Sequence, residues 1–346
     1  MSADVRTPTG QAVPLVRGGP LWAAPGLTVL VLGAVAVSPD AYLHAAVARM
    51  VPLALLAVSV AVVTGHAGLP TLGQVAPYAA GAYTTARLAL AGVTLAPAHL
   101  LAAAVAGAAT AGLLGAVLVR YRGTVFLMLS LAVAELTAIT AGQWRAVSGG
   151  TDGLAGIPAA RLLPGMPPLV ADRPVLLYAV TVALATATAA MLLLRRHRML
   201  LTGVRDNEDR ARASGHPVNA YLLAVHTGAG AVAGVAGALL IHTHWWITPA
   251  DVGFGTAALA LLAVVIGGSR SLPGAAVGAL IVLGVRDVVA APWPGHAPLL
   301  LGGLFVAAVY LLPGGLTAIP TRVTTAARRA RQGARLTPPA AERNPT

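Results

Sequence analysis

The chain has 346 residues, of which 57% are apolar and only 10% are charged, and its mean hydropathy is +0.78. An average soluble domain carries about 25% charged residues, so this composition indicates an integral membrane protein. Every one of the 23 basic residues is arginine. The lack of lysine excludes a P-loop ATPase site and a Schiff-base lysine, and the lack of cysteine excludes disulfides and thiolate metal sites.

Apolar segments long enough to cross a bilayer as helix, roughly 17 to 25 residues, recur along nearly the whole chain. A barrel would show period-2 alternation instead, so we expect an all-α integral membrane protein, a polytopic helical bundle of about ten (8 to 10) transmembrane helices. The predicted spans are 21–38, 48–64, 74–91, 97–119, 123–141, 174–194, 219–241, 256–268, 274–290 and 297–313. The eighth is short as drawn and begins nearer Gly253.

The arginines predict the orientation of these spans. With the N-terminus inside, 17 arginines lie in the inner segments and 6 in the outer ones, the bias typical of a cytoplasmic membrane. We expect a cytoplasmic tail at 1–20, a transmembrane domain at 21–313 and a basic cytoplasmic tail at 314–346. The formal charge of +12 is then topogenic, with anionic lipid rather than nucleic acid as its neighbour. An alternative is that the first span is a cleaved signal peptide, although its apolar core exceeds the usual 7 to 15 residues.

A polar insert at 195–217, "RRHRMLLTGVRDNEDRARASGHP", interrupts the apolar pattern on the inner side. Its signals frame a helix of about a dozen residues, with Thr202 as N-cap, Gly215 closing the C-terminus and Pro217 blocking extension. A helix this short is marginal alone in water, so its own bundle or a second protein must hold it.

Two acid-before-base pairs at i, i+4 support this helix, Asp206 with Arg210 and Glu208 with Arg212, each worth a few tenths of a kcal/mol. One interpretation is a solvated loop helix. The other is a docking helix that offers Val204, Ala211 and a charged rim to a groove of another protein. Periodicity does not separate the two.

Glu135 lies mid-span, where an ionised acid costs on the order of 3 kcal/mol, so we expect it to face the bundle. It is either a functional polar point or a hinge of the bundle, or it makes an interhelical hydrogen bond as an ionised or neutral acid. The stretch 65–73 has three glycines and a proline between two apolar runs, typical of an interrupted helix that lines a cavity, or of an ordinary inner turn. We expect the polar side chains of Thr71 and Gln74 to lie there.

The outer loop 142–173 contains "SGGTDGLAGIP", whose glycines specify tight turns and a compact external structure. It either meets a second protein outside the membrane or caps the bundle. The run His242 to Trp246, "HTHWW", is typical of an aromatic belt at the outer interface, and we expect no metal site there. Small residues at four-residue spacing, such as Gly230 and Gly234, predict close helix packing. No arrangement of catalytic residues is present, so we expect no enzymatic activity.

Five runs match one family in order and spacing, between about residues 50 and 315. They are "GHAGLPTLGQVAPYAAGAY" from Gly65, "LSLAVAEL" from Leu129, "SGGTDGLAGIP" from Ser148, the polar insert, and "ITPADVGF" with "VIGGSRSLPGAAVGA" from Ile247 and Val265. The chain resembles the LivM-type permease subunit of branched-chain amino acid ABC importers.

The resemblance implies a permease that forms half of a translocation pathway and is coupled to separate ATPases. The ATPase-coupling residues are then Thr202, Val204, Arg205, Asn207, Glu208, Ala211, Arg212 and Gly215. Pathway or helix-break residues are Gly65, Gly68, Thr71, Gly73, Gln74 and Glu135. The signature of the outer loop comprises Gly149, Gly150, Thr151, Asp152, Gly153, Gly156 and Pro158.

The partners implied are a second, LivH-type permease, two cytosolic ATPase subunits that carry ATP and magnesium, and an external substrate-binding protein. The chain itself needs no cofactor, and its location is a bacterial cytoplasmic membrane with both termini cytoplasmic. The substrate expected is a branched-chain or other hydrophobic amino acid. An alternative is a stand-alone secondary transporter or channel for a small solute such as urea or an amide, which predicts more intramembrane acids than Glu135 and a visible inverted repeat.

Overall fold

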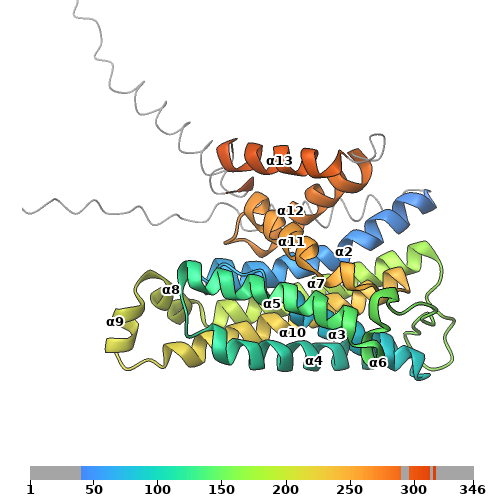
Figure 1. The fold of residues 1–346 in the computed structure, drawn as a ribbon, viewed down its shortest axis with the longest axis horizontal. Helices are drawn as coiled ribbons and strands as arrows, with labels where there is room; N and C mark the ends of the chain where they lie inside the picture. Colours follow the sequence, from blue (N-terminus) through green and yellow to red (C-terminus); the bar gives the residue numbers. More distant parts are fainter. Residues whose placement is uncertain (1–39, 290–295, 312–314, 317–346) are drawn as a thin grey trace, which may run out of the picture.

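The computed structural model describes residues 40–289, 296–311 and 315–316. The first predicted span, 21–38, and the predicted tail 1–20 lie outside the described residues, as does nearly all of the tail 314–346. The described part consists of helices, connecting loops and two isolated β-bridges (Figure 1). The all-α class expected from composition is therefore confirmed.

Each predicted span from the second to the tenth coincides with one long helix. The long helices are α2 (Ala41–Ala61), α3 (Val75–Leu90), α4 (Ala96–Leu118), α5 (Gly123–Gln143), α7 (Asp172–Arg196), α10 (Val218–His244), α11 (Phe254–Gly267), α12 (Leu272–Gly284) and α13 (Ala297–Leu311). Two of them continue as π-helices, α2 as η1 (Val62–His66) and α12 as η4 (Val285–Val289). Short elements fill the loops: α6 (Arg145–Ser148), η2 (Gly150–Asp152), α8 (Arg198–Asp206), α9 (Glu208–Ala213) and η3 (Pro249–Val252).

Membrane-length helices are fewer than the predicted spans. Five helices of the described part are long and apolar enough to cross a bilayer, and a sixth is added if α11 and α12, bent by 119°, form one broken span. The remaining apolar helices, α3 and α13, have 16 and 15 residues. The polytopic membrane class is thus confirmed, whereas the number of eight to ten crossings stays a prediction.

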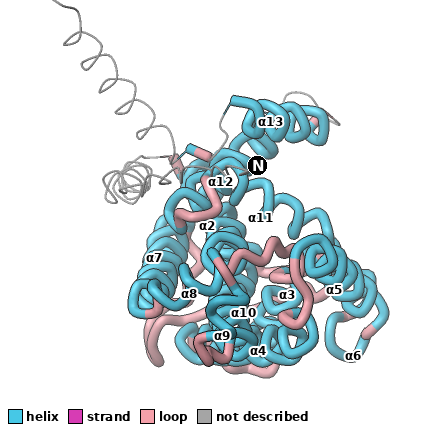
Figure 2. Tube along the Cα trace, turned by 90° about the vertical axis from the view of Figure 1, so that its left-hand side faces the viewer, coloured by secondary structure: helices cyan, strands magenta, loops and turns pink. Residues whose placement is uncertain are grey.

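Helix α10 occupies the centre of the bundle and packs against α2, α3, α4 and α7 (Figure 2). Glycines allow its backbone to approach its neighbours closely: a Cβ on Gly107 would lie 2.4 Å from the Gly230 carbonyl oxygen, and one on Gly234 would lie 2.1 Å from that of Ala103. In lipid, helix association depends on such close van der Waals packing. The packing role predicted for Gly230 and Gly234 is confirmed.

The loops sort into two sets at opposite ends of the bundle (Figure 1). The end that carries α8 and α9, called here the α8–α9 end, also holds the α4–α5 turn, the segment 67–74 and the α11–α12 turn, as contacts from Arg122 to Glu208 and from Arg205 to Gly65 show. At the other end, called the α6 end, the bridge between Leu95 and Arg161 joins two further loops. Of the described loops, those that the arginines predict on the inner side therefore lie together at the α8–α9 end.

A buried chain of hydrogen bonds joins three helices at the α6 end. Nδ1 of His99 lies 3.1 Å from Nε2 of His242, Nε2 of His99 lies 2.9 Å from the Val93 carbonyl oxygen, and the Tyr178 hydroxyl lies 3.0 Å from Nδ1 of His242. A carbonyl oxygen only accepts, so His99 donates from Nε2, and Nδ1 of its neutral ring is an acceptor. Nε2 of a neutral His242 then donates to Nδ1 of His99, and the Tyr178 hydroxyl donates to Nδ1 of His242. His242 is buried in this chain, so its assignment to an aromatic belt is wrong; Trp246 is the exposed aromatic of the run.

Candidate functional site

The polar insert forms two short helices instead of the single one expected from its capping signals. Thr202 lies inside α8, so its prediction as N-cap is wrong. The break falls at Asn207, whose extended backbone has φ −156° and whose side chain accepts a 2.8 Å hydrogen bond from the Arg210 amide. Asn207 therefore caps α9, while Gly215, at φ +81°, follows its last turn as predicted.

Helix α8 rests on its own bundle through its apolar side. Val204 is only 6% exposed and Leu201 only 5%, and both are buried in this chain. The expectation that Val204 would be offered to another protein is therefore wrong. Apart from Met199, which is 89% exposed, the surface left free on α8 and the start of α9 is mainly polar, and it includes Thr202, Asp206, Asn207, Asp209 and Arg210.

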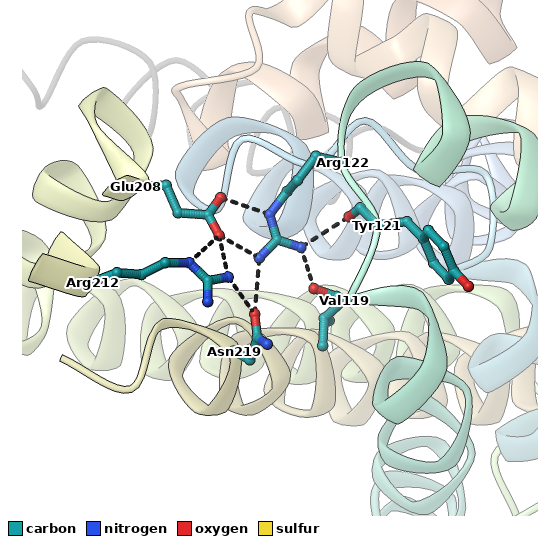
Figure 3. Close-up of polar contacts among 6 residues, drawn as sticks. All are labelled: Val119, Tyr121, Arg122, Glu208, Arg212 and Asn219. Atoms are coloured by element: carbon teal, nitrogen blue, oxygen red, sulfur yellow. Dashed lines mark hydrogen bonds and ion pairs between the residues drawn. The ribbon is translucent and has the colours of Figure 1, made fainter. Parts of the chain in front are cut away.

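Glu208 is the centre of a hydrogen-bonded ion cluster at the α8–α9 end (Figure 3). Arg122 donates to both of its carboxylate oxygens, at 2.7 and 2.8 Å, and Arg212 donates to Oε1 at 2.7 Å. Asn219 accepts from both guanidinium groups at 3.1 and 3.0 Å. The cluster ties α9 to the last residue of the α4–α5 connection, directly before α5, and to the first turn of α10.

The opposite charges of this cluster stabilise one another. The hydrogen bonds from Arg122, and secondarily those from Arg212, lower the pKa of Glu208 below its ordinary value of 4.5. The predicted pair of Glu208 with Arg212 is confirmed, whereas Asp206 and Arg210 form no ion pair within the described residues. Arg122 also donates to the carbonyl oxygens of Val119 and Tyr121, so its guanidinium is held by the turn it stands on.

A second contact joins α8 to the interrupted helix. Arg205 donates to the carbonyl oxygen of Gly65, in the π-helix that ends α2, and its side chain packs beside Gly68. Gly65 in turn abuts the α11–α12 turn so closely that a Cβ would lie 1.7 Å from the Ser269 carbonyl oxygen. Burial, and next the nearby positive charge of Arg270, lower the pKa of Arg205. Arg205 therefore contacts the place where α2 breaks and α11 turns.

The break between η1 and α3 is lined by buried polar side chains, as predicted for an interrupted helix. Thr71 and Gln74 have no exposed surface. The backbone amides freed by the break bind side chains: Leu72 donates to Ser130 Oγ at 3.1 Å and Gly73 donates to Thr71 Oγ1 at 3.0 Å. These backbone groups are thereby satisfied by side chains of the same chain.

Gln74 extends this polar cluster into the bundle. Its Oε1 lies 3.1 Å from Ser59 Oγ and its Nε2 lies 3.4 Å from Nδ1 of His226. Ser59 also lies 2.8 Å from the Ala229 carbonyl oxygen. The cluster links α2, α3 and α10, so a shift of the break is transmitted to the central helix α10.

Glu135 lies on an exposed face of α5, so the expectation that it faces its own bundle is wrong. The side of α5 that packs inward carries Phe126, Ser130 and Ala134. Two hollows of the described part are lined almost wholly by apolar side chains, one of about 60 Å³ between α2, α7 and α12 and one open groove on α4, and neither includes a predicted pathway residue.

The predicted signature of the outer loop forms a compact turn structure. Four of its glycines, Gly149, Gly150, Gly153 and Gly156, have φ between 70° and 80°, which L side chains rarely adopt. Leu154 and Ile247 exchange backbone hydrogen bonds of 2.9 and 3.0 Å, which tie the loop to the end of α10. Arg87, at the end of α3, donates to the carbonyl oxygen of Val147 at 2.7 Å. Thr151, Asp152 and Pro158 remain exposed at its surface.

Sequence reasoning missed Arg122 and Asn219 at the ion cluster, and Ser59, Ser130 and His226 at the break. The last three are isolated polar residues within apolar spans, a signal that could have marked them. Arg122 and Asn219 gave no such signal, because they lie 86 and 11 positions from Glu208 and only the packing of α4, α5 and α10 brings them together.

Comparison with known proteins agrees with this arrangement. The family model described as "Branched-chain amino acid transport system / permease component" matches residues 42–310. The chain is 28% identical over 290 residues to the high-affinity branched-chain amino acid transport system permease protein LivM of Escherichia coli K12, covering 76% of this chain and 67% of that protein. It is equally similar to LivM of Salmonella typhimurium LT2, with the same identity and coverage. No solved structure matches it.

The matched region runs from the first turn of α2 to the end of α13, and so includes the ion cluster, the break and the compact loop. The chain belongs to the family of permease components of branched-chain amino acid transport systems.

Proposed function

We propose that this chain is the membrane permease of an ATP-driven importer of branched-chain amino acids, moved by separate ATPase subunits that bind the polar surface of α8 and α9. One observation carries the proposal: Glu208 holds the α9 helix to Arg122, directly before α5, while Arg205 holds α8 to Gly65. A push on the two short helices therefore reaches both α5 and the break in the bundle.

The α8–α9 end faces the cytoplasm in this proposal, with both termini on that side of a bacterial cytoplasmic membrane. The distribution of arginine supports this orientation. Besides Arg122 and Arg205, the described residues of that end include Arg120, Arg195, Arg196 and Arg210. The ATPases then meet the exposed rim of Asp209 and Arg210, and not the buried Val204.

A second permease of the LivH type supplies the other half of the pathway. The exposed acid on α5 supports this, because a pathway enclosed by this chain alone would turn Glu135 inward. The compact loop at the α6 end, with Thr151, Asp152 and Pro158 exposed, would receive substrate from an external binding protein. ATP and magnesium act on the ATPase subunits, and the chain itself holds no cofactor.

Vesicles that contain this chain, the second permease, two ATPase subunits and the binding protein test the proposal. Radiolabelled L-leucine should enter them only with ATP, and omission of any subunit should stop uptake. ATP-independent flux by this chain alone would instead identify a secondary transporter or channel. No flux in any combination, with any branched-chain amino acid, would leave a scaffold that keeps the fold without transport.

A further inference from the structure

Glu135 stands deep within the apolar part of α5. The helix runs from Gly123 to Gln143, so Glu135 lies 135 − 123 = 12 positions from one end and 143 − 135 = 8 from the other. At 1.5 Å rise per residue these are about 18 Å and 12 Å, which places the carboxyl group within a hydrocarbon core about 30 Å thick.

The carboxylate has no partner among the described residues. None of the hydrogen bonds or ion pairs that join them involves Glu135. Its neighbours on the same exposed surface are apolar, with Leu131 37%, Leu136 60% and Ile139 51% exposed. An ionised acid on a lipid-facing helix costs on the order of 3 kcal/mol even on permissive insertion scales. A group outside the described residues must therefore meet Glu135.

The opposite side of α5 is attached to the moving parts of the bundle. Ser130 accepts a 3.1 Å hydrogen bond from the amide of Leu72 in the break, and Arg122, directly before α5, binds Glu208. Glu135 thus stands on a helix that is coupled both to the break and to the α8–α9 element. If separate ATPases move the α8–α9 element, as proposed above, they also move α5 and therefore Glu135.

We propose that Glu135 is the counter-charge for the ammonium group of a zwitterionic amino acid during its passage between this chain and the second permease. The inference rests on the proposed function. A free amino acid carries its ammonium group through a region where an unpaired cation is costly to desolvate, and a carboxylate at this depth offsets that cost through a charge-assisted hydrogen bond. Urea and simple amides carry no such charge and need no acid here, so the residue selects for amino-acid substrates.

The full importer in proteoliposomes, supplied with saturating leucine-loaded binding protein, tests this role. Glu135→Gln should lower the maximal rate of ATP-driven L-leucine uptake about tenfold or more, the factor that corresponds to about 1.4 kcal/mol. Glu135→Asp should recover part of the rate, because it keeps the charge. Leu136→Ala, on the same exposed surface, should transport at the wild-type rate. Basal ATP hydrolysis and the melting temperature of the complex should stay unchanged in Leu136→Ala, and all three variants should still assemble with the second permease.

Two results would overturn the inference while the proposed function stands: uptake by Glu135→Gln at the wild-type rate, or loss of permease association together with uptake. The second result would mean that Glu135 pairs with a basic residue of the second permease. Failure of the wild-type importer to take up any branched-chain amino acid with ATP would instead overturn the proposed function, and the inference with it.

Discussion

Arg122 and Glu208, 86 positions apart in the sequence, form a two-pronged ion pair at the α8–α9 end, with Nε to Oε2 at 2.7 Å and Nη2 to Oε1 at 2.8 Å (Figure 3). Their side chains keep 30% and 26% exposure, and pairs of this kind contribute roughly 0.2 to 1 kcal/mol to stability. So small a contribution does not hold the bundle together. The pair instead joins α9 to the residue directly before α5, and under the proposed function it couples the two helices.

Glu208→Gln should therefore separate ATP hydrolysis from transport while the bundle stays folded. We expect leucine uptake to fall about tenfold, with ATP hydrolysis retained and the melting temperature lowered by no more than the few degrees that about 1 kcal/mol produces. Asp172→Asn is the control, because Asp172 is an exposed acid at the opposite end of the bundle, where α7 begins, and forms no ion pair within the described residues. Unchanged coupling in Glu208→Gln would contradict the transmission through Arg122.

The same attachment should respond to acid in one direction only. The pKa of Glu208 is lowered, chiefly by Arg122, so the pair's contribution is complete above the ordinary value of 4.5 and is lost as pH falls through the lowered value. Because the chain has no cysteine, spin labels can be placed uniquely on Ala213→Cys and Thr124→Cys. Their distance distribution should be constant from pH 8 to about 5 and broaden only below 4.5, whereas in Glu208→Gln it should be broad throughout.

Asn207→Ala should loosen α9 without affecting α8. The side chain of Asn207 accepts the Arg210 amide proton, and loss of such an N-cap costs about 1 kcal/mol. Hydrogen exchange of the amides at 208–213 should accelerate about fivefold, while those of Leu201 and Val204, whose side chains are buried, should keep their rates. Asn207→Asp, which retains the accepting oxygen, should behave as wild type; equal acceleration in both variants would contradict the capping role.

Two glycines of α10 provide a direct test of helix packing. Gly230→Ala would place a Cβ 2.1 Å from that of Ala111, so the helices must separate, and we expect a loss of about 1 to 3 kcal/mol. A Cβ on Gly228, two residues earlier, would meet no atom of a neighbouring described element within 4 Å. Gly228→Ala should therefore be neutral or slightly stabilising, because alanine favours helix. Thermal melting in detergent compares the two, and equal melting temperatures would contradict the close approach of α10 to α4.

The hydrogen-bond chain at the α6 end predicts that removal of a single oxygen atom lowers the stability of the protein. Tyr178→Phe removes the hydroxyl that lies 3.0 Å from Nδ1 of buried His242, and an unsatisfied buried acceptor costs about 1 to 3 kcal/mol. Tyr42→Phe removes the same atom from a side chain that is 83% exposed and should leave the melting temperature unchanged. If the two variants melt alike, the chain through His99 does not stabilise that end.

The sequence by itself determined the helices, because an apolar run must satisfy its backbone groups internally in lipid and its length sets where it begins and ends. The bounds of α4, α5 and α10 differ from the predicted spans by at most three residues at either end. The close packing of α10 and the break before α3 could equally be predicted from the sequence, because glycine and proline act on the local backbone. The polar insert was identified too, but its division into two helices was not.

Only the tertiary structure decided which side of each helix is covered. Glu135 was expected to face the bundle because an acid avoids lipid, yet α5 lies at an edge and turns it outward. Val204 was expected to be free, yet α8 folds back and buries it. Arg122 binds Glu208 from 86 positions away, and Asn219 joins the cluster by accepting from Arg122 and Arg212, so no local pattern encodes that meeting. Hydrophobic periodicity specifies that a helix has a buried face. Only the arrangement of the other helices decides whether this chain or another molecule covers that face.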